Sequence, residues 1–281
     1  MNTHFLNGKF VSEEQLVISP RDLGFSRGYA VFDFLKTYPH HRPFKLQEHI
    51  NRLFNSADLI GLKTPWSKEQ VQKWVLETLE VNKSSEEKFI RIFISGGVPK
   101  TSNTMFPSEC PTIIILVDPA VQYPKEQYEN GVGVISVKHK RYSPEAKSNN
   151  YIEGVKQTQQ AKTIGAVEPI YYSDTQVFEG SNSNLFAVIN NKLLTPKTNI
   201  LLGITRAVLL EIMELSIPIE VKDFTFSDLL QASEAFLTGS GKEITPITSI
   251  DGQLVGNGKV GPITKEAIRQ FAEYTHSDLW K

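Results

Sequence analysis

A single lysine within SPEAKSNNYIEG, residues 143–154, is the first candidate for chemistry in this chain. A lysine amine becomes a useful nucleophile when its neutral form is accessible, and it then forms Schiff bases with carbonyl groups. The residues that follow Lys147, Ser148 to Tyr151, are hydrogen-bonding types that line polar pockets. The alternative interpretation is a solvated surface charge, which describes most lysines.

An acidic residue precedes a short polar loop in VFEGSNSNLF, residues 177–186. One interpretation is a simple β-turn, because Gly, Ser and Asn are favoured in turns. The other places Glu179 at the end of a strand, facing a ligand. A carboxylate in that place could keep a pyridinium nitrogen protonated, which gives pyridoxal phosphate its capacity to accept electrons.

A glycine stands just before a helical pattern in LLGITRAVLLEI, residues 201–212. Thr205 is expected to cap that helix. The free N–H groups of a helix start, together with a hydroxyl and a glycine, form a ready phosphate site. An ordinary capped helix is the alternative.

A glycine-rich turn, Gly239-Ser240-Gly241, ends a strand within LTGSGKEITPI, residues 237–247. Its N–H groups could bind an anion, and a plain loop is the alternative. Lys242 directly after it could reach a substrate carboxylate, although we expect an ordinary surface lysine there.

The order of these features along the chain carries more information than any one of them. In the order of these features, the chain resembles the class IV aminotransferases, which are the fold type IV pyridoxal-phosphate enzymes. This family includes branched-chain aminotransferases, D-amino acid transaminases and aminodeoxychorismate lyases. The similarity covers nearly the whole chain and runs through FLNGKFV, EHINRLFNSA, EGSNSNLF, LGITR, EITPI and DGQLVGNGKVGPITK.

This resemblance implies pyridoxal 5'-phosphate as cofactor and a role for each matching residue. Lys147 matches the lysine that holds the cofactor and moves the proton between Cα and C4′, and Glu179 matches the partner of the pyridine nitrogen. The positions that match phosphate ligands are Arg52, Ile204 (through its backbone N–H), Thr205 and Ser240. The other implied cofactor positions are Tyr151, at the 3′-oxygen, Ser181 and Asn182.

Two arginines and a glycine are the expected substrate-binding residues. The loop GGVPKTSNTMFP lacks the Arg-x-His pair of the well-known D-amino acid type. Arg91 matches an arginine of the branched-chain type, and Arg27 lies in RGYAVFDF, which resembles a less typical group of D-amino acid transaminases. We expect both to bind substrate carboxylates, with Gly241 beside them. A backbone or surface contact for Arg27 and a solvent-facing charge for Arg91 are the alternatives.

The expected reaction is transamination between an amino acid and a 2-oxo acid such as 2-oxoglutarate. The amino acid is either a D-amino acid, such as D-glutamate or D-alanine, or a branched-chain L-amino acid. The alternatives are an aminodeoxychorismate lyase, which eliminates pyruvate, and a non-catalytic cofactor-binding protein. The resemblance also implies a homodimer, with Arg27 contributed across the interface.

Several elements must position these residues. Asn7-Gly8 between apolar residues predicts a hairpin. Apolar spacing predicts helices over 48–60, 68–81, 151–164, 205–215 and 262–275. Strands are predicted over 89–95 and 112–117, in a mixed sheet, and over 131–137, 168–172, 184–189 and 234–238. His49, on the helix of Arg52, is expected to bond to backbone, and His40 and His41 to form a hairpin tip.

Composition limits the class of protein. Thirty basic residues nearly balance 31 acidic ones, which gives no electrostatic case for binding nucleic acid or an anionic membrane. A single cysteine, Cys110, excludes an internal disulfide and a Cys-rich metal site. Without a signal-like start or a membrane-length apolar run, we expect a cytoplasmic protein. We expect an α+β (mixed α/β) fold with a small domain over 1–118, a linker over 119–130 and a cofactor-binding domain over 131–281.

Overall fold

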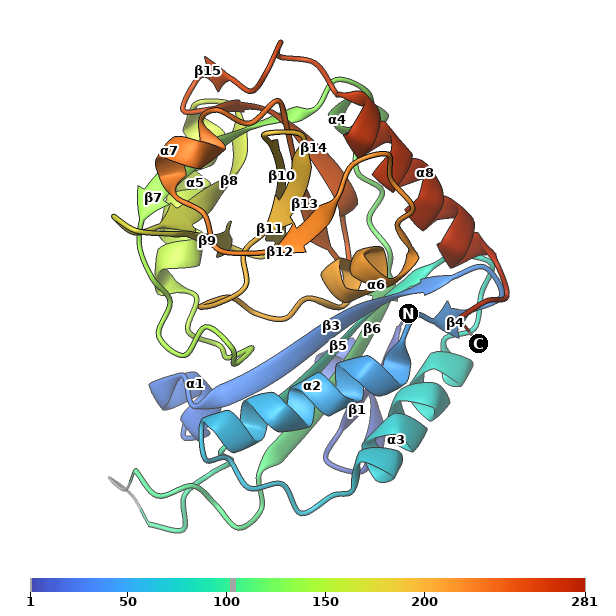
Figure 1. Cartoon of the computed structure of the whole chain (residues 1–281). Helices are drawn as coiled ribbons and strands as arrows, with labels where there is room; N and C mark the ends of the chain where they lie inside the picture. Colours follow the sequence, from blue (N-terminus) through green and yellow to red (C-terminus); the bar gives the residue numbers. More distant parts are fainter. Residues whose placement is uncertain (1, 102–104, 281) are drawn as a thin grey trace. The chain divides into compact units, whose positions relative to one another are not determined.

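The computed structural model describes residues 2–101 and 105–280, and the chain divides into two compact units (Figure 1). The first unit comprises Met1–Val121 and Glu145–Asn150, and the second comprises Gln122–Pro144 and Tyr151–Lys281. The short segment that carries Lys147 therefore belongs with the N-terminal half, although the expected boundaries placed it in the C-terminal domain. Residues 102–104 of the loop after Ser95 lie outside the described part.

An antiparallel sheet with the strand order β2-β1-β6-β5-β3-β4 forms the first unit. Its strands are β1 (Thr3–Leu6), β2 (Lys9–Ser12), β3 (Ala30–Tyr38), β4 (Arg42–Pro43), β5 (Lys88–Ser95) and β6 (Thr112–Pro119). The helical segments are η1 (Glu13–Gln15), α1 (Leu23–Arg27), α2 (Leu46–Leu59) and α3 (Lys68–Val81). The hairpin predicted at Asn7-Gly8 is confirmed, because β1 and β2 pair on either side of it.

Strand β3 presents alternate residues to the helices of this unit. Val31 and Leu35 are fully buried and belong to the same core as Ile50 and Leu53 of α2. Because side chains alternate along a strand, Asp33 points to the same face, and it is also fully buried. A carboxylate therefore lies within an apolar layer, where it needs partners.

The second unit is built on a mixed sheet in the order β12-β11-β10-β13-β14-β7-β8-β9, with β15 paired to β14. Its strands are β7 (Val132–Lys138), β8 (Ala166–Tyr172), β9 (Val177–Gly180), β10 (Asn184–Ile189), β11 (Lys192–Thr195), β12 (Ile219–Val221), β13 (Glu234–Gly239), β14 (Glu243–Ile250) and β15 (Gln253–Leu254). Its helices are α4 (Lys125–Glu129), α5 (Ile152–Thr163), α6 (Ile204–Ile212), α7 (Phe226–Leu229) and α8 (Pro262–His276).

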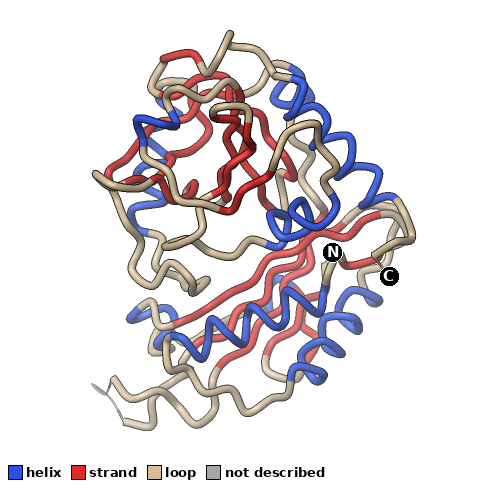
Figure 2. Tube along the Cα trace, in the orientation of Figure 1, coloured by secondary structure: helices blue, strands red, loops and turns tan. Residues whose placement is uncertain are grey.

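The mixed α/β class expected from the sequence is confirmed (Figure 2). Every predicted helix and strand is present. One prediction is wrong: segments 89–95 and 112–117 pair antiparallel, in an antiparallel rather than a mixed sheet. The predictions also omitted several elements, among them the long strands β3 and β14. Within the described residues, no helix is long and apolar enough to cross a membrane.

Candidate active site

Lys147 is held on the edge of β3 by backbone hydrogen bonds. The Phe32 amide donates to the Lys147 carbonyl at 2.9 Å, and the Asn149 amide donates to the Ala30 carbonyl at 3.0 Å. These bonds make residues 147–149 a short antiparallel extension of the sheet, with a bridge between Val31 and Ser148. A lysine whose own carbonyl is bonded to a strand has a defined position, unlike a lysine at the tip of a free loop.

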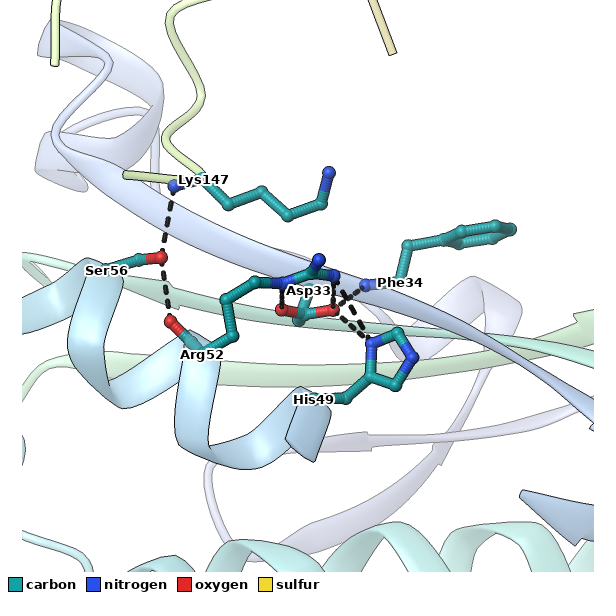
Figure 3. A network of polar contacts seen from close by, with 6 residues as sticks. All are labelled: Asp33, Phe34, His49, Arg52, Ser56 and Lys147. Carbon is teal, nitrogen blue, oxygen red and sulfur yellow. Dashed lines mark hydrogen bonds and ion pairs between the residues drawn. The ribbon is translucent and has the colours of Figure 1, made fainter. Parts of the chain in front are cut away.

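The Lys147 side chain is half-buried, and its amine lies 4.6 Å from the centroid of the Phe32 ring. The Lys147 amide also donates to the Ser56 hydroxyl at 3.0 Å, and this hydroxyl donates to the Arg52 carbonyl at 2.8 Å (Figure 3). Ser56 is fully buried on α2. It therefore connects the position of Lys147 to the helix that carries Arg52.

Arg52 and His49 both bind the buried carboxylate of Asp33 (Figure 3). Arg52 Nε donates to Oδ2 and Nη2 donates to Oδ1, both at 2.8 Å, while His49 Nδ1 lies 2.6 Å from Oδ1. Such a two-bond arginine–carboxylate pair fixes the plane of the guanidinium as well as its place. Asp33, on strand β3, thus holds Arg52 in one orientation.

Electrostatics sets the charges of Asp33 and His49 in this network. Burial alone would raise the pKa of the Asp33 carboxyl, but Arg52 and His49 hold that pKa well below its ordinary value. Burial lowers the pKa of His49, and the charges of Arg52 and Lys147 reinforce the lowering against the opposing effect of Asp33. Asp33 is therefore an anion at neutral pH and His49 is uncharged.

The expectation that His49 bonds to backbone through its side chain is wrong. Its partner is Asp33, and because a carboxylate only accepts hydrogen bonds, Nδ1 carries the proton. Nε2 is then an unprotonated acceptor, and this buried atom has no hydrogen-bond partner among the described residues. Protonating it would place an unsatisfied charged donor in the core, which agrees with the lowered pKa.

Glu179, on β9 of the second unit, is a buried carboxylate with several donors around it. Arg141 donates to Oε1 through Nε at 2.9 Å and lies 2.8 Å away through Nη2. Oε2 accepts from Asn184 Nδ2 at 3.2 Å and from the Leu201 amide at 2.9 Å. This environment favours an ionised carboxylate, which is the state that a protonated ring nitrogen requires of its partner.

Helix α6 begins at Ile204 with Gly203 as its N-cap, a residue that has no side chain to cap it. The expected cap by Thr205 is wrong, because Thr205 lies inside the first turn and is buried. A β-carbon on Gly203 would overlap Asn184 Oδ1, so glycine is required there for steric reasons. The N–H groups of Ile204 and Thr205 belong to an uncapped helix N-terminus, which suits an anion.

The serine-rich loop after β9 and the turn after β13 are tied to a buried glutamate. Ser181 and the Asn182 amide both bind Glu168, and Lys242 forms an ion pair with it. Lys242 is thus neither a surface lysine nor a free anion ligand. Ser240 lies in the turn, half-buried, directly before Gly241.

The remaining candidates lie closer to the surface. Arg27 is exposed at the end of α1 and donates to the Ser26 carbonyl at 2.9 Å. Arg91 on β5 lies 3.6 Å from Asp118, with its guanidinium 5.6 Å from the centroid of the Phe34 ring. Tyr151 is half-buried as the N-cap of α5, immediately after the Lys147 segment. His40 and His41 occupy the turn between β3 and β4, as predicted.

The residues that support the candidates were not predicted from the sequence. Asp33 supports Arg52, Arg141 and Asn184 support Glu179, and Glu168 supports the serine loop. A signal existed for Asp33, since a single acid interrupts the apolar run AVFDFL. Arg141 and Glu168 gave no such signal, because their partners lie 38 and 13 or more residues away in the chain.

Comparison with known proteins supplies independent findings. The family model described as amino-transferase class IV matches residues 30–250. A putative branched-chain-amino-acid aminotransferase of Methanocaldococcus jannaschii is 36% identical over 280 residues, which cover 96% of this chain and 95% of that protein. A D-alanine aminotransferase of Staphylococcus aureus (strain MSSA476) is 32% identical over 281 residues, with 99% of both chains covered.

A solved structure has the same fold. The branched-chain aminotransferase of Thermoproteus uzoniensis, crystallised with norvaline, superposes with a TM-score of 0.89 at 29% identity, covering 99% of this chain and 97% of that one. The fold type IV architecture expected from the sequence is therefore confirmed. Each of these relatives is an aminotransferase, so the lyase alternative is not favoured.

Proposed function

Since the chain belongs to the class IV aminotransferases, a pyridoxal-phosphate-dependent family, we propose that it exchanges the amino group of an amino acid with a 2-oxo acid such as 2-oxoglutarate. The amino acid is a D-amino acid, such as D-glutamate or D-alanine, or a branched-chain L-amino acid. The observation that carries the proposal is the fixed position of Lys147 on the edge of β3, tied through Ser56 to the helix of Arg52.

The residues of both units fit the cofactor chemically. The first unit offers an amine over an aromatic ring and a guanidinium in a fixed orientation. The second offers a buried carboxylate among donors and an uncapped helix N-terminus. Pyridoxal phosphate supplies an aldehyde for the amines of lysine and substrate, and a protonated ring that withdraws electrons from the substrate Cα.

In the first unit, we assign Lys147 two tasks. Its amine would hold the cofactor between turnovers, and the free amine would move the proton between Cα and C4′. Arg52 binds the phosphate, with its plane set by Asp33.

In the second unit, we assign Glu179 to the pyridine nitrogen, with Arg141 and Asn184 orienting its carboxylate. The N–H groups of Ile204 and Thr205 and the hydroxyl of Ser240 bind the phosphate. Further cofactor contacts are assigned to Tyr151, at the 3′-oxygen, and to Ser181 and Asn182, whose bonds to Glu168 fix their loop.

Substrate recognition is assigned to Arg27, Arg91 and Gly241. Arginine binds carboxylates through two parallel N–H donors, so one such residue can hold the α-carboxylate and a second can hold a distal one. The weak 3.6 Å pair between Arg91 and Asp118 would yield to a substrate carboxylate. We propose a homodimer in which Arg27 serves the partner's site. We expect the enzyme to act in the cytoplasm.

The test is a transamination assay on the purified protein loaded with pyridoxal phosphate. D-alanine, D-glutamate and L-leucine are each supplied with a 2-oxo acid acceptor, and the new amino acid is resolved by chiral chromatography. Activity with either D-amino acid or with L-leucine supports transamination and decides the hand of the substrate. Absence of product from all three, with cofactor bound, would contradict the proposal. Lys147→Ala is the inactive control.

A further inference from the structure

A fully enclosed carboxylate in the second unit gathers donors from two separate loops. Glu168 on β8 is 1% exposed. Its Oε1 accepts from Ser183 Oγ at 2.8 Å and forms a short ion pair with Lys242 Nζ, and its Oε2 accepts from Ser181 Oγ at 3.1 Å and the Asn182 amide at 3.2 Å. We call these five residues the Glu168 cluster.

The donors come from segments that meet at one end of the sheet. Ser181 to Ser183 precede β10, and Lys242 lies in the turn after β13. Strands β10 and β13 are antiparallel neighbours with Asn184 opposite Thr238, so the loop and the turn lie at the same end. A β-carbon on Gly239 would lie 3.4 Å from the Asn182 carbonyl, which shows that the two backbones pass close together.

Glycine at position 180 lets the serine loop close over the carboxylate. A β-carbon there would overlap Ser183 Oγ and would lie 2.8 Å from Glu168 Oε2. The Gly180 amide also donates to the Ser183 carbonyl at 2.8 Å, which closes the loop on itself. The 181–183 loop is therefore packed directly against the Glu168 carboxylate.

The ion pair with Glu168 holds the Lys242 side chain in place. Its side chain is 15% exposed, and its charge is balanced by a carboxylate that is almost completely buried. Charge-assisted hydrogen bonds of this kind are stronger than neutral ones and hold the donor in place. Lys242 therefore anchors the turn that contains Ser240 and Gly241, and its charge is committed to Glu168.

We propose that Glu168 is a positioning residue for phosphate binding: it holds the 181–183 loop and the 239–242 turn in the arrangement that places Ser240 against the phosphate. This inference rests on the proposed function, in which Ser240 binds the cofactor phosphate. Glu168 touches neither cofactor nor substrate in this account, and its effect reaches the phosphate through Lys242 and the serine loop.

The experiment compares two ligands that differ only in the phosphate. Holoenzymes of the wild type and Glu168→Gln are dialysed to equilibrium against pyridoxal phosphate or pyridoxal, and dissociation constants are measured. Glutamine is close in shape but lacks the charge, so Lys242 loses its partner. Glu220→Gln is the matched control, because Glu220 pairs with Lys192 at 2.6 Å on an exposed part of the same unit.

The expected result is specific to the phosphate. In Glu168→Gln the dissociation constant of pyridoxal phosphate should rise about tenfold, the equivalent of one lost charge-assisted hydrogen bond, while that of pyridoxal changes less than about twofold. Glu220→Gln should match the wild type for both ligands. Lys242→Met, which leaves the other donors on Glu168, should show the same pattern more weakly and serves if Glu168→Gln fails to fold.

Equal losses for both ligands, or no loss for either, would overturn the proposal, because a merely structural glutamate would not distinguish them. Hydrogen exchange gives a second readout that needs no cofactor: amides of 181–183 and 239–242 should exchange faster in Glu168→Gln. If the wild type bound no pyridoxal phosphate, the proposed function would fail. Faster exchange in those two segments would still support the positioning of the loops, and unchanged exchange would overturn it.

Discussion

Both carboxylate oxygens of the fully buried Asp33 accept hydrogen bonds from Arg52, each at 2.8 Å. This pair joins the middle of β3 to α2, the same strand and helix that fix the backbone of Lys147. Asp33 thus orients Arg52, the proposed phosphate ligand. It also joins the strand and the helix to which the backbone of Lys147, the proposed catalytic lysine, is bonded.

Replacing Asp33 with asparagine should destabilise the protein strongly. An amide cannot satisfy two guanidinium donors and the His49 donor, and Arg52 is left as a nearly buried charge. Breaking one partner of such a pair costs about 3–5 kcal/mol of unfolding free energy, which urea denaturation can measure. The control is Asp118→Asn, whose carboxylate is partly exposed and 3.6 Å from Arg91, and which should cost less than about 1 kcal/mol. Similar losses in both would contradict the account.

His49 should make stability depend on pH. Its folded pKa lies below the unfolded value of 6.5, so the unfolded chain binds a proton first as the pH falls. Above pH 6.5, His49 contributes no pH dependence. Below pH 6.5, the free energy of unfolding falls by up to about 1.4 kcal/mol per pH unit. His49→Asn keeps a donor to Asp33 and removes the titration, so its free energy of unfolding should fall less than the wild type's between about pH 6.5 and 5.

His40→Asn is the control for this measurement. His40 is exposed in a turn with a positive φ of 70°, which asparagine tolerates. It should change the free energy of unfolding by less than about 0.5 kcal/mol, as expected for an exposed site. A slope that is as steep in His49→Asn as in the wild type would show that His49 does not titrate as described.

Ser56→Ala should disturb Lys147 more than it disturbs α2. The Ser56 hydroxyl donates to the Arg52 carbonyl within its own helix and accepts from the Lys147 amide. Its loss leaves that amide without this partner, at a cost of about 1–3 kcal/mol. In Thr78→Val, the control, the lost bond is only the one to the Trp74 carbonyl in α3. Hydrogen exchange at the Lys147 amide should accelerate in Ser56→Ala alone, and acceleration in both would count against the specific link.

Gly203→Ala should act on Glu179 through Asn184. The new β-carbon would overlap Asn184 Oδ1, and Asn184 Nδ2 donates both to Glu179 and to the Leu201 carbonyl. Overpacking of this kind costs about 1–3 kcal/mol of unfolding free energy. Because Asn184→Ala removes the atom that is struck, the double variant should be no less stable than Asn184→Ala. Additive losses, measured by denaturation, would argue against this collision.

The sequence predicted the elements well because their signals are local. Helix 68–81 follows from apolar spacing and matches α3 (Lys68–Val81), and the Asn7-Gly8 hairpin follows from two adjacent residues with positive φ. Strand β3 was missed because its alternation places Asp33 among the core positions, where a local pattern expects an apolar residue. A buried acid is stabilised there by Arg52 and His49, and these side chains come from another element.

The supporting residues of the site were unpredictable for the same reason. Glu168 and Lys242 are 74 residues apart, and Arg141 and Glu179 are 38 apart. Lys242 was predicted to be an ordinary surface lysine, because no residue near it in the sequence indicates a buried partner. The order of motifs made Lys147, Glu179 and the helix start at Gly203 candidates. It could not reveal the side chains that orient them.

The central claim, that Lys147 holds the cofactor, has a direct test. The holoenzyme is reduced with sodium borohydride, digested, and searched by mass spectrometry for the peptide that carries the reduced cofactor. We predict the adduct on Lys147, loss of the visible absorption band in Lys147→Ala, and no change in Lys140→Ala, because Lys140 is an exposed lysine close to it in the sequence. An adduct on another lysine of the native enzyme, or a reducible adduct that persists at the same site in Lys147→Ala, would contradict it.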